Sequence, residues 1–171
     1  MGNLQMKIKR EQLTAKAKYL IPKNNIWLKR ACLIFCFVLF DYISTLIFIT
    51  SPMQEGNLLV RQFMESYGIF LGLTIFDVLI NIPIYVIICF NSHFSSLPSR
   101  FARIADPLID VFLAWFVAGY HYSGATSWFW TGPDMIRQLL GFSIYFTIIM
   151  FTYQTPNMQQ VFFCKQKVVN Q

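Results

Sequence analysis

The chain has 171 residues, of which 56% are hydrophobic and 13% are charged, whereas soluble domains contain about 25% charged residues. This composition argues against a soluble globular domain, a disordered chain, a collagen and a disulfide framework, because it supplies more apolar surface than a chain of this length can bury in its own core. The net charge of +6 comes mainly from basic residues outside the apolar blocks or at their ends, and without a basic face on a soluble fold it predicts no nucleic-acid partner.

The N-terminal segment, residues 1–25, is polar and basic. Within it, residues 7–20 mix basic and apolar side chains. This pattern predicts either a short amphipathic helix that lies on anionic lipid or a flexible cytosolic leader. We do not expect a cleavable signal peptide, because no apolar core occurs in this segment and no small-residue cleavage site follows.

Four apolar blocks follow and predict an all-α, polytopic membrane protein with a bundle of four transmembrane helices. The blocks cover about residues 26–50, 69–90, 107–122 and 135–153, which leaves residues 154–171 as a tail. The first block is long enough to cross a hydrocarbon core of about 30 Å at about 1.5 Å per residue. The third block is the shortest, and Asp106 with Pro107 predicts its N-cap and first helical residue.

The basic residues predict the orientation of this bundle. Eight of the 14 Lys and Arg residues lie before the first block or in its first five residues, and the connection between blocks two and three and the tail carry most of the others. Arg61 and Arg137 alone lie on the opposite side. The positive-inside rule therefore places both termini in the cytoplasm of a multi-pass cell-membrane protein, although composition does not distinguish an organellar membrane. The cysteines lie toward the reducing side, so no disulfide is expected.

Three carboxylates lie inside apolar blocks: Asp41, Asp77 and Asp110. An ionised aspartate in the hydrocarbon region costs at least ~2.5 kcal/mol, so each needs a partner, a proton or a function. All three lie ~12 to 16 Å from the outer ends of their blocks, and we predict one shared polar cavity in the outer half of the bilayer. For Asp77 the alternative is a hydrogen-bonded patch with Asn81 that satisfies the backbone freed by Pro83.

Polar residues near the outer side extend this predicted cavity. Glu55 and Asn57 follow the first block, and His121 is three turns beyond Asp110 on the same helical stripe, at the outer mouth. The alternative for His121 is an anchor in an aromatic belt. Asp134 is expected to be a first-turn helix acid, and Arg61 or Arg137 can pair with a carboxylate.

The chemistry of these groups suits a proton relay or a hard or borderline divalent ion. The candidate ion- or proton-binding residues are Asp41, Thr45, Glu55, Asn57, Asp77, Asp110 and His121. Four of them are the candidate metal ligands: Asp41, Glu55, Asp77 and His121. We predict no organic cofactor, because the sequence contains none of the motifs for phosphate loops, zinc sites or haem.

One short motif resembles a known family. Asp41-Tyr-Ile-Ser-Thr45, followed by Glu55-Gly-Asn57, is similar to a pattern in an uncharacterised family of small polytopic, largely archaeal membrane proteins, which have Asp-x-x-Ser/Thr-Thr in the first helix and Glu-x-Asn-Pro in the next loop. The match covers residues 40–68, and Leu58 stands where the family has proline. The resemblance implies that Asp41, Thr45, Glu55 and Asn57 act together, and it implies no reaction.

These features favour a membrane protein that binds or moves a small cation or a proton. The second hypothesis is an accessory or assembly subunit of a larger membrane complex, or a homo-oligomer, in which the buried acids pair with partner helices. The third is an intramembrane metal-dependent hydrolase. We favour a role without catalysis. Membrane lipid is a partner under all three hypotheses, and a larger membrane complex or a homo-oligomer is a further partner under the second.

Overall fold

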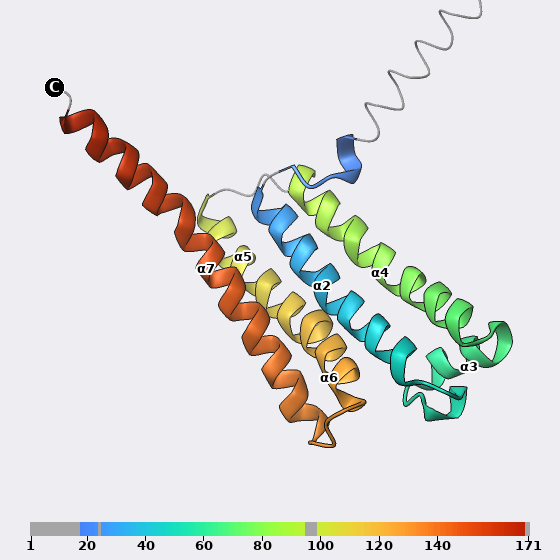
Figure 1. Cartoon of the computed structure of the whole chain (residues 1–171). Coiled ribbons are helices and arrows are strands. Elements are labelled where there is room, and N and C mark those ends of the chain that lie inside the picture. The colour runs from blue at the N-terminus through green and yellow to red at the C-terminus, as the bar shows by residue number, and fades with distance from the viewer. Residues whose placement is uncertain (1–17, 24, 95–98, 170–171) are drawn as a thin grey trace, which may run out of the picture. The chain divides into compact units, whose positions relative to one another are not determined.

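The computed structural model describes residues 18–23, 25–94 and 99–169, and every regular element in these ranges is a helix (Figure 1). The predicted all-α class is confirmed. The chain forms two compact units: unit 1 comprises residues 1–32 and 46–101, and unit 2 comprises residues 33–45 and 102–171. Helix α2 (Asn25–Phe48) contributes its middle to unit 2 and its two ends to unit 1.

Three helices are long and apolar enough to cross a membrane. They are Asn25–Phe48 in α2, Ile69–His93 in α4 and Asp134–Thr152 in α7, close to three of the four predicted blocks. Large apolar side chains on them point outward, such as Ile47, Phe70 and Phe151, each more than 60% exposed. A soluble fold would bury such side chains, whereas lipid accepts them.

The third predicted block has different bounds from those expected. Helix α5 (Ser99–Leu113) begins well before Pro107 and continues through a π-helical turn, η3 (Ala114–Gly119), into α6 (Tyr120–Ser127). Pro107 therefore lies inside a helix, and the prediction that Asp106 and Pro107 begin it was wrong. The apolar residues Phe101 and Ile104 lie upstream of the proline at helical spacing from Leu108, which follows it. The one backbone hydrogen bond that proline removes does not end the helix.

Unit 1 is built around α4 (Ile69–Phe94), with a 3-10 turn η1 (Lys18–Leu20) beside its C-terminal end. A second 3-10 turn, η2 (Pro52–Gln54), leads into α3 (Leu58–Tyr67), which packs on α4. The chain reverses at Gly68, whose φ of 83° is a conformation that favours glycine. Gly72 lies so close to the main chain of Phe63 and Met64 that a Cβ atom there would clash.

Unit 2 is built around α7 (Asp134–Val169), which packs along η3 and α6 (Figure 1). Small residues allow this close approach: a Cβ on Gly141 would lie 2.5 Å from Cβ of Tyr122, and one on Gly119 would lie 2.8 Å from the Gln138 carbonyl oxygen. Phe37 of α2 lies against the rings of Tyr122 and Tyr145. The predicted tail, residues 154–171, continues α7 as a helix to Val169.

The predicted amphipathic segment falls largely outside the described residues. Its first part, residues 7–17, is not among them, whereas residues 18–20 form η1.

Candidate functional site

The structure brings two of the predicted site residues into direct contact. Asp41 of α2 and His121 of α6 both belong to unit 2, and Oδ2 of Asp41 lies 2.8 Å from Nδ1 of His121. The side chains are 21% and 11% exposed. A carboxylate that meets Nδ1 orients the imidazole ring and leaves Nε2 as its second polar atom. We call these two residues the Asp41–His121 pair.

Gly124 brings the main chain of α6 up to the Asp41 carboxylate. It lies three residues after His121, on the same helical face. A Cβ atom on Gly124 would lie 2.7 Å from Oδ1 and 2.9 Å from Oδ2 of Asp41, closer than ordinary van der Waals contact. The glycine therefore provides the space that the carboxylate occupies while it contacts His121.

This arrangement predicts that Gly124→Ala displaces the Asp41 carboxylate. The added methyl group overpacks the site, so we expect the free energy of unfolding to fall by about 1–3 kcal/mol, even though alanine is the better helix former. Reversible unfolding in detergent micelles measures this change. The imidazole ¹⁵N chemical shifts of His121 should also change as its carboxylate partner moves.

Gly56→Ala is the matched control for this substitution. No atom lies within 4 Å of a Cβ built on Gly56, so its effect should stay within about 0.5 kcal/mol. Equal unfolding free energies for Gly124→Ala and the parent chain, with unchanged His121 shifts, would show that Gly124 does not position Asp41.

Thr45 lies one helical turn after Asp41, and its hydroxyl accepts a hydrogen bond of 3.1 Å from Nε1 of Trp128. Ser44 and Thr45 are both buried, at 6% and 5% exposure. The face of α2 that carries Asp41 is therefore polar over a full turn. Trp128, the C-cap residue of α6, lies against this face.

The π-helical turn changes the direction in which His121 points relative to Asp110. Eleven residues of α-helix would return His121 to the stripe of Asp110, which was the basis of the predicted alignment. Because η3 inserts a wider turn between the two residues, the regular α-helical spacing does not hold between them. The prediction that His121 lies on the same helical stripe as Asp110 was therefore wrong. Gln138 of α7 donates a 3.2 Å hydrogen bond to the Trp115 carbonyl in this turn. Asp110 is buried in unit 2, at 2% exposure.

Glu55 and Asn57 form a helix cap in unit 1. Oδ1 of Asn57 accepts a hydrogen bond from the Leu59 amide, 3.0 Å away, and so caps α3. Oε1 of Glu55 accepts one from the Asn57 amide at 2.8 Å, and the Arg61 guanidinium donates to the Glu55 carbonyl. The resemblance groups four residues together, and the structure divides them between the two units. Asp41 and Thr45 belong to unit 2, where they contact His121 and Trp128. Glu55 and Asn57 belong to unit 1.

Asp77 and Asn81 lie on α4 in unit 1. The Asn81 amide donates a 2.9 Å hydrogen bond to the main-chain carbonyl of Asp77. Pro83 removes the helical donor of the Leu79 carbonyl, four residues earlier. The Asn81 side chain donates to the Asp77 carbonyl instead, so this hydrogen bond does not satisfy the backbone carbonyl that the proline frees. Among the described residues, Oδ1 of Asn81 is buried without a hydrogen-bond partner.

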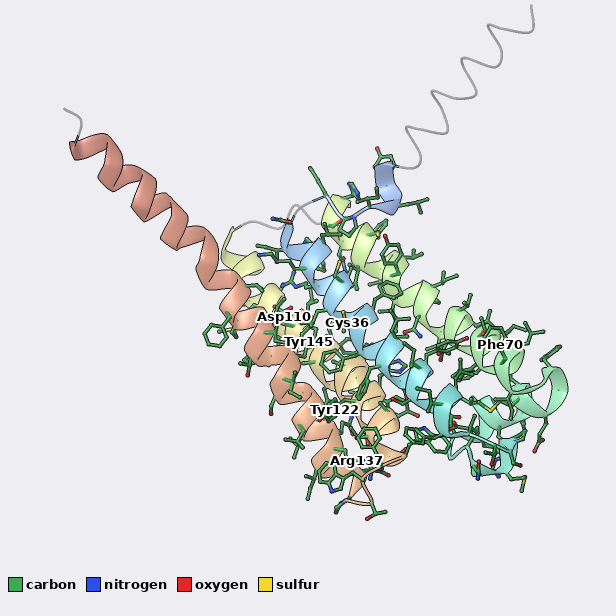
Figure 2. The ribbon with its side chains drawn as sticks, viewed as in Figure 1. Cys36, Phe70, Asp110, Tyr122, Arg137 and Tyr145 are labelled. Atoms are coloured by element: carbon green, nitrogen blue, oxygen red, sulfur yellow. The ribbon has the colours of Figure 1, made fainter. Side chains whose placement is uncertain are left out.

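Arg137 is a buried cation that pairs with the carboxylate of Asp134, as predicted for one of the two arginines, and it also contacts main-chain carbonyls that the sequence did not indicate. Its guanidinium donates to the carbonyls of Ser123, Trp130 and Gly132, to the Ser123 hydroxyl, and to the carboxylate of Asp134. In Figure 2 it lies at the end of unit 2 where α6 connects to α7, with Asp110 and Tyr145 farther from that end. Asp134 is a first-turn acid of α7, as expected, and its side chain is 85% exposed.

Within the described ranges, no group of three or more His, Cys, Asp or Glu side chains is placed to hold a metal ion. Of the four predicted metal ligands, Asp41 and His121 lie in unit 2, and Glu55 and Asp77 lie in unit 1. Cys32, Cys36 and Cys89 are free thiols. Comparison with protein-family models, with curated proteins and with solved structures gives no match for this chain.

Proposed function

We propose that this chain is a multi-pass membrane protein that binds a proton at the Asp41–His121 pair and moves it across the bilayer. The observation that carries this proposal is the 2.8 Å contact between a carboxylate and an imidazole, both largely buried, with the carboxylate on a helix long and apolar enough to cross a membrane. Buried acids and histidines in such helices are rare and mark proton pathways.

The chemistry of the pair suits a proton. When the carboxylate is ionised, the imidazole Nδ1–H donates to it; when the carboxyl is protonated, its O–H can donate to Nδ1. While Nε2 carries a proton, a second proton can reside on Nδ1 beside an ionised carboxylate or on the carboxyl group beside a neutral imidazole, without moving the heavy atoms. Nε2 is the other atom through which a proton can enter or leave. The exchange needs no third ligand.

The proposed topology has four crossings with both termini in the cytoplasm. Three crossings are the candidate spans in α2, α4 and α7. The remaining one, third in chain order, is the helical stretch from Ser99 to Ser127, which includes η3. The distribution of Lys and Arg supports this orientation. Asp41 and His121 each lie about 10 Å from the C-terminal ends of α2 and α6, at about 1.5 Å per residue. In this topology the pair lies in the outer half of the bilayer, and the cell membrane is the proposed location.

Proton flux through the purified full chain tests the proposal. The protein is reconstituted into vesicles that contain a pH-sensitive dye, and a potassium diffusion potential set by valinomycin drives protons inward. We expect the lumen to acidify faster than in protein-free vesicles prepared in the same way. Equal rates in the two preparations would overturn the proposed function.

A further inference from the structure

Residues 18–23, which we call the strap, are fixed by their main chain to the last turns of α4. The Leu20 carbonyl accepts hydrogen bonds from the Tyr85 hydroxyl at 2.6 Å and the Cys89 thiol at 3.3 Å. The Ile21 carbonyl lies 2.7 Å from Nε2 of His93, which donates to it. A fourth contact joins the main-chain amide of Lys23 to the Ser92 hydroxyl at 3.1 Å. The four donors and acceptors on α4 share one face, at helical spacing.

The strap binds α4 through its main chain, and its side chains differ in exposure: Pro22 is buried, and the Tyr19 ring lies edge-on to the imidazole of His93, with 5.2 Å between the ring centroids. Tyr19, Leu20 and Ile21 are nevertheless 53%, 61% and 61% exposed, which gives three consecutive large side chains that the described part of the chain leaves more than half uncovered. Exposure of these apolar side chains to water is unfavourable, and exposed apolar clusters mark contacts with lipid or protein.

The position of the strap indicates lipid as the material that covers these side chains. The α4 span ends at His93, and Tyr85 lies about 12 Å before that end. The strap therefore lies beside the last turns of a span, at the depth of the headgroup–acyl boundary, where interfacial segments bury their apolar side chains. Tyrosine is typical of this boundary.

The charges beside the strap indicate which lipids it contacts. Lys18 and Lys23 flank the three apolar residues, and residues 7–16 carry four further basic residues against the single acid Glu11. Basic residues next to a span attract the anionic lipids of the cytoplasmic leaflet, the side on which the proposed topology places the strap. We propose that the strap is an interfacial anchor that inserts Tyr19, Leu20 and Ile21 into a bilayer surface rich in anionic lipid.

A nitroxide label on Leu20→Cys tests this proposal in the full chain. The background replaces Cys32, Cys36 and Cys164 with alanine, and Cys89 with serine, which keeps a donor for the Leu20 carbonyl. The labelled protein is placed in nanodiscs of phosphatidylcholine alone or mixed with phosphatidylglycerol. Collision of the nitroxide with oxygen and with a water-soluble nickel chelate reports its depth.

We expect oxygen collisions to exceed nickel collisions in both lipids, and nickel access to fall by about twofold when phosphatidylglycerol is added. High salt should remove this difference, because it screens the lysine–headgroup attraction. Lys18→Gln with Lys23→Gln should reduce it as well. The matched control is a label on Met53→Cys, because Met53 is 67% exposed at the other end of unit 1 and has no adjacent lysine; its nickel access should not depend on phosphatidylglycerol.

Three results would overturn the proposal. High nickel access in both lipids would place the strap in water. Low access to both oxygen and nickel would mean that protein covers it. Equal depth with and without phosphatidylglycerol would remove the preference for anionic lipid. None of these results depends on proton flux, so the strap and the Asp41–His121 pair are tested separately.

Discussion

Vesicles that contain the Asp41→Asn chain are expected to conduct protons no faster than vesicles without protein. Asparagine has nearly the shape of aspartate and can still accept a hydrogen bond from His121, but its amide does not take up a proton. We expect a loss of at least about 100-fold in the protein-dependent rate, the lower end of what a positioned proton-transfer group contributes. The initial rate of lumen acidification under a potassium diffusion potential measures it.

Two further variants show whether the loss is specific to the pair. His121→Gln removes the imidazole and should lower the rate as Asp41→Asn does. Asp134→Asn is the matched control, because it makes the same chemical change in unit 2 at a carboxylate that is 85% exposed and lies in the first turn of α7; its rate should equal that of the parent. Parent-like flux in Asp41→Asn, or an equal loss in Asp134→Asn, would mean that Asp41 does not carry the proton.

The sequence predicted the apolar helices well because hydropathy depends only on local residue types. The predicted first block, residues 26–50, corresponds to α2 at Asn25–Phe48, and the second and fourth blocks overlap almost completely with the other two candidate spans. Asp41 stood out by the same reasoning, since a carboxylate in such a helix is costly. Neither inference required knowledge of which helices are neighbours.

The features that the sequence did not reveal depend on contacts between helices. A π-helical turn has no simple residue signature, so the phase between Asp110 and His121 could not be read from spacing alone. Gly124 occurs in a run of small residues, and only the approach of Asp41 shows why a side chain is excluded there.

Asn57 directly precedes a helix, and asparagine is a common residue at the N-cap, so its capping role was predictable from the local sequence. In the structure Asn57 caps α3, and Glu55 accepts a hydrogen bond from the Asn57 amide. A resemblance that groups residues by motif does not show that they meet in space.

Arg137 illustrates the difference between a charge in a sequence and a charge in a fold. The sequence predicts that Arg137 is one of two cations on the outer side of the membrane. In the structure its guanidinium joins Ser123 of α6 to the connection between α6 and α7, through five acceptor atoms. Ser123 lies two residues after His121, so this cluster of contacts also fixes the end of α6 that presents His121 to Asp41.

Arg137→Met should therefore destabilise unit 2 strongly. Methionine fills a similar volume but has no donor, and each buried carbonyl that loses its donor costs about 1–3 kcal/mol. The Ser123 acceptors are buried, whereas the carbonyls of Trp130 and Gly132 are part-buried and can bind water instead. We expect the free energy of unfolding to fall by about 2–4 kcal/mol, measured by reversible unfolding in mixed detergent micelles.

Two controls separate the carbonyl contacts from the ion pair. Asp134→Asn removes the carboxylate partner and should cost less than about 1 kcal/mol, because that side chain is mostly in solvent. Arg137→Lys keeps the charge, but its compact ammonium cannot reach acceptors on both sides as the guanidinium fork does, so its loss should lie between those of the other two variants. If Asp134→Asn cost as much as Arg137→Met, the ion pair would be the stabilising contact. The carbonyls would then be incidental, and the end of α6 that carries His121 would be held by a surface charge.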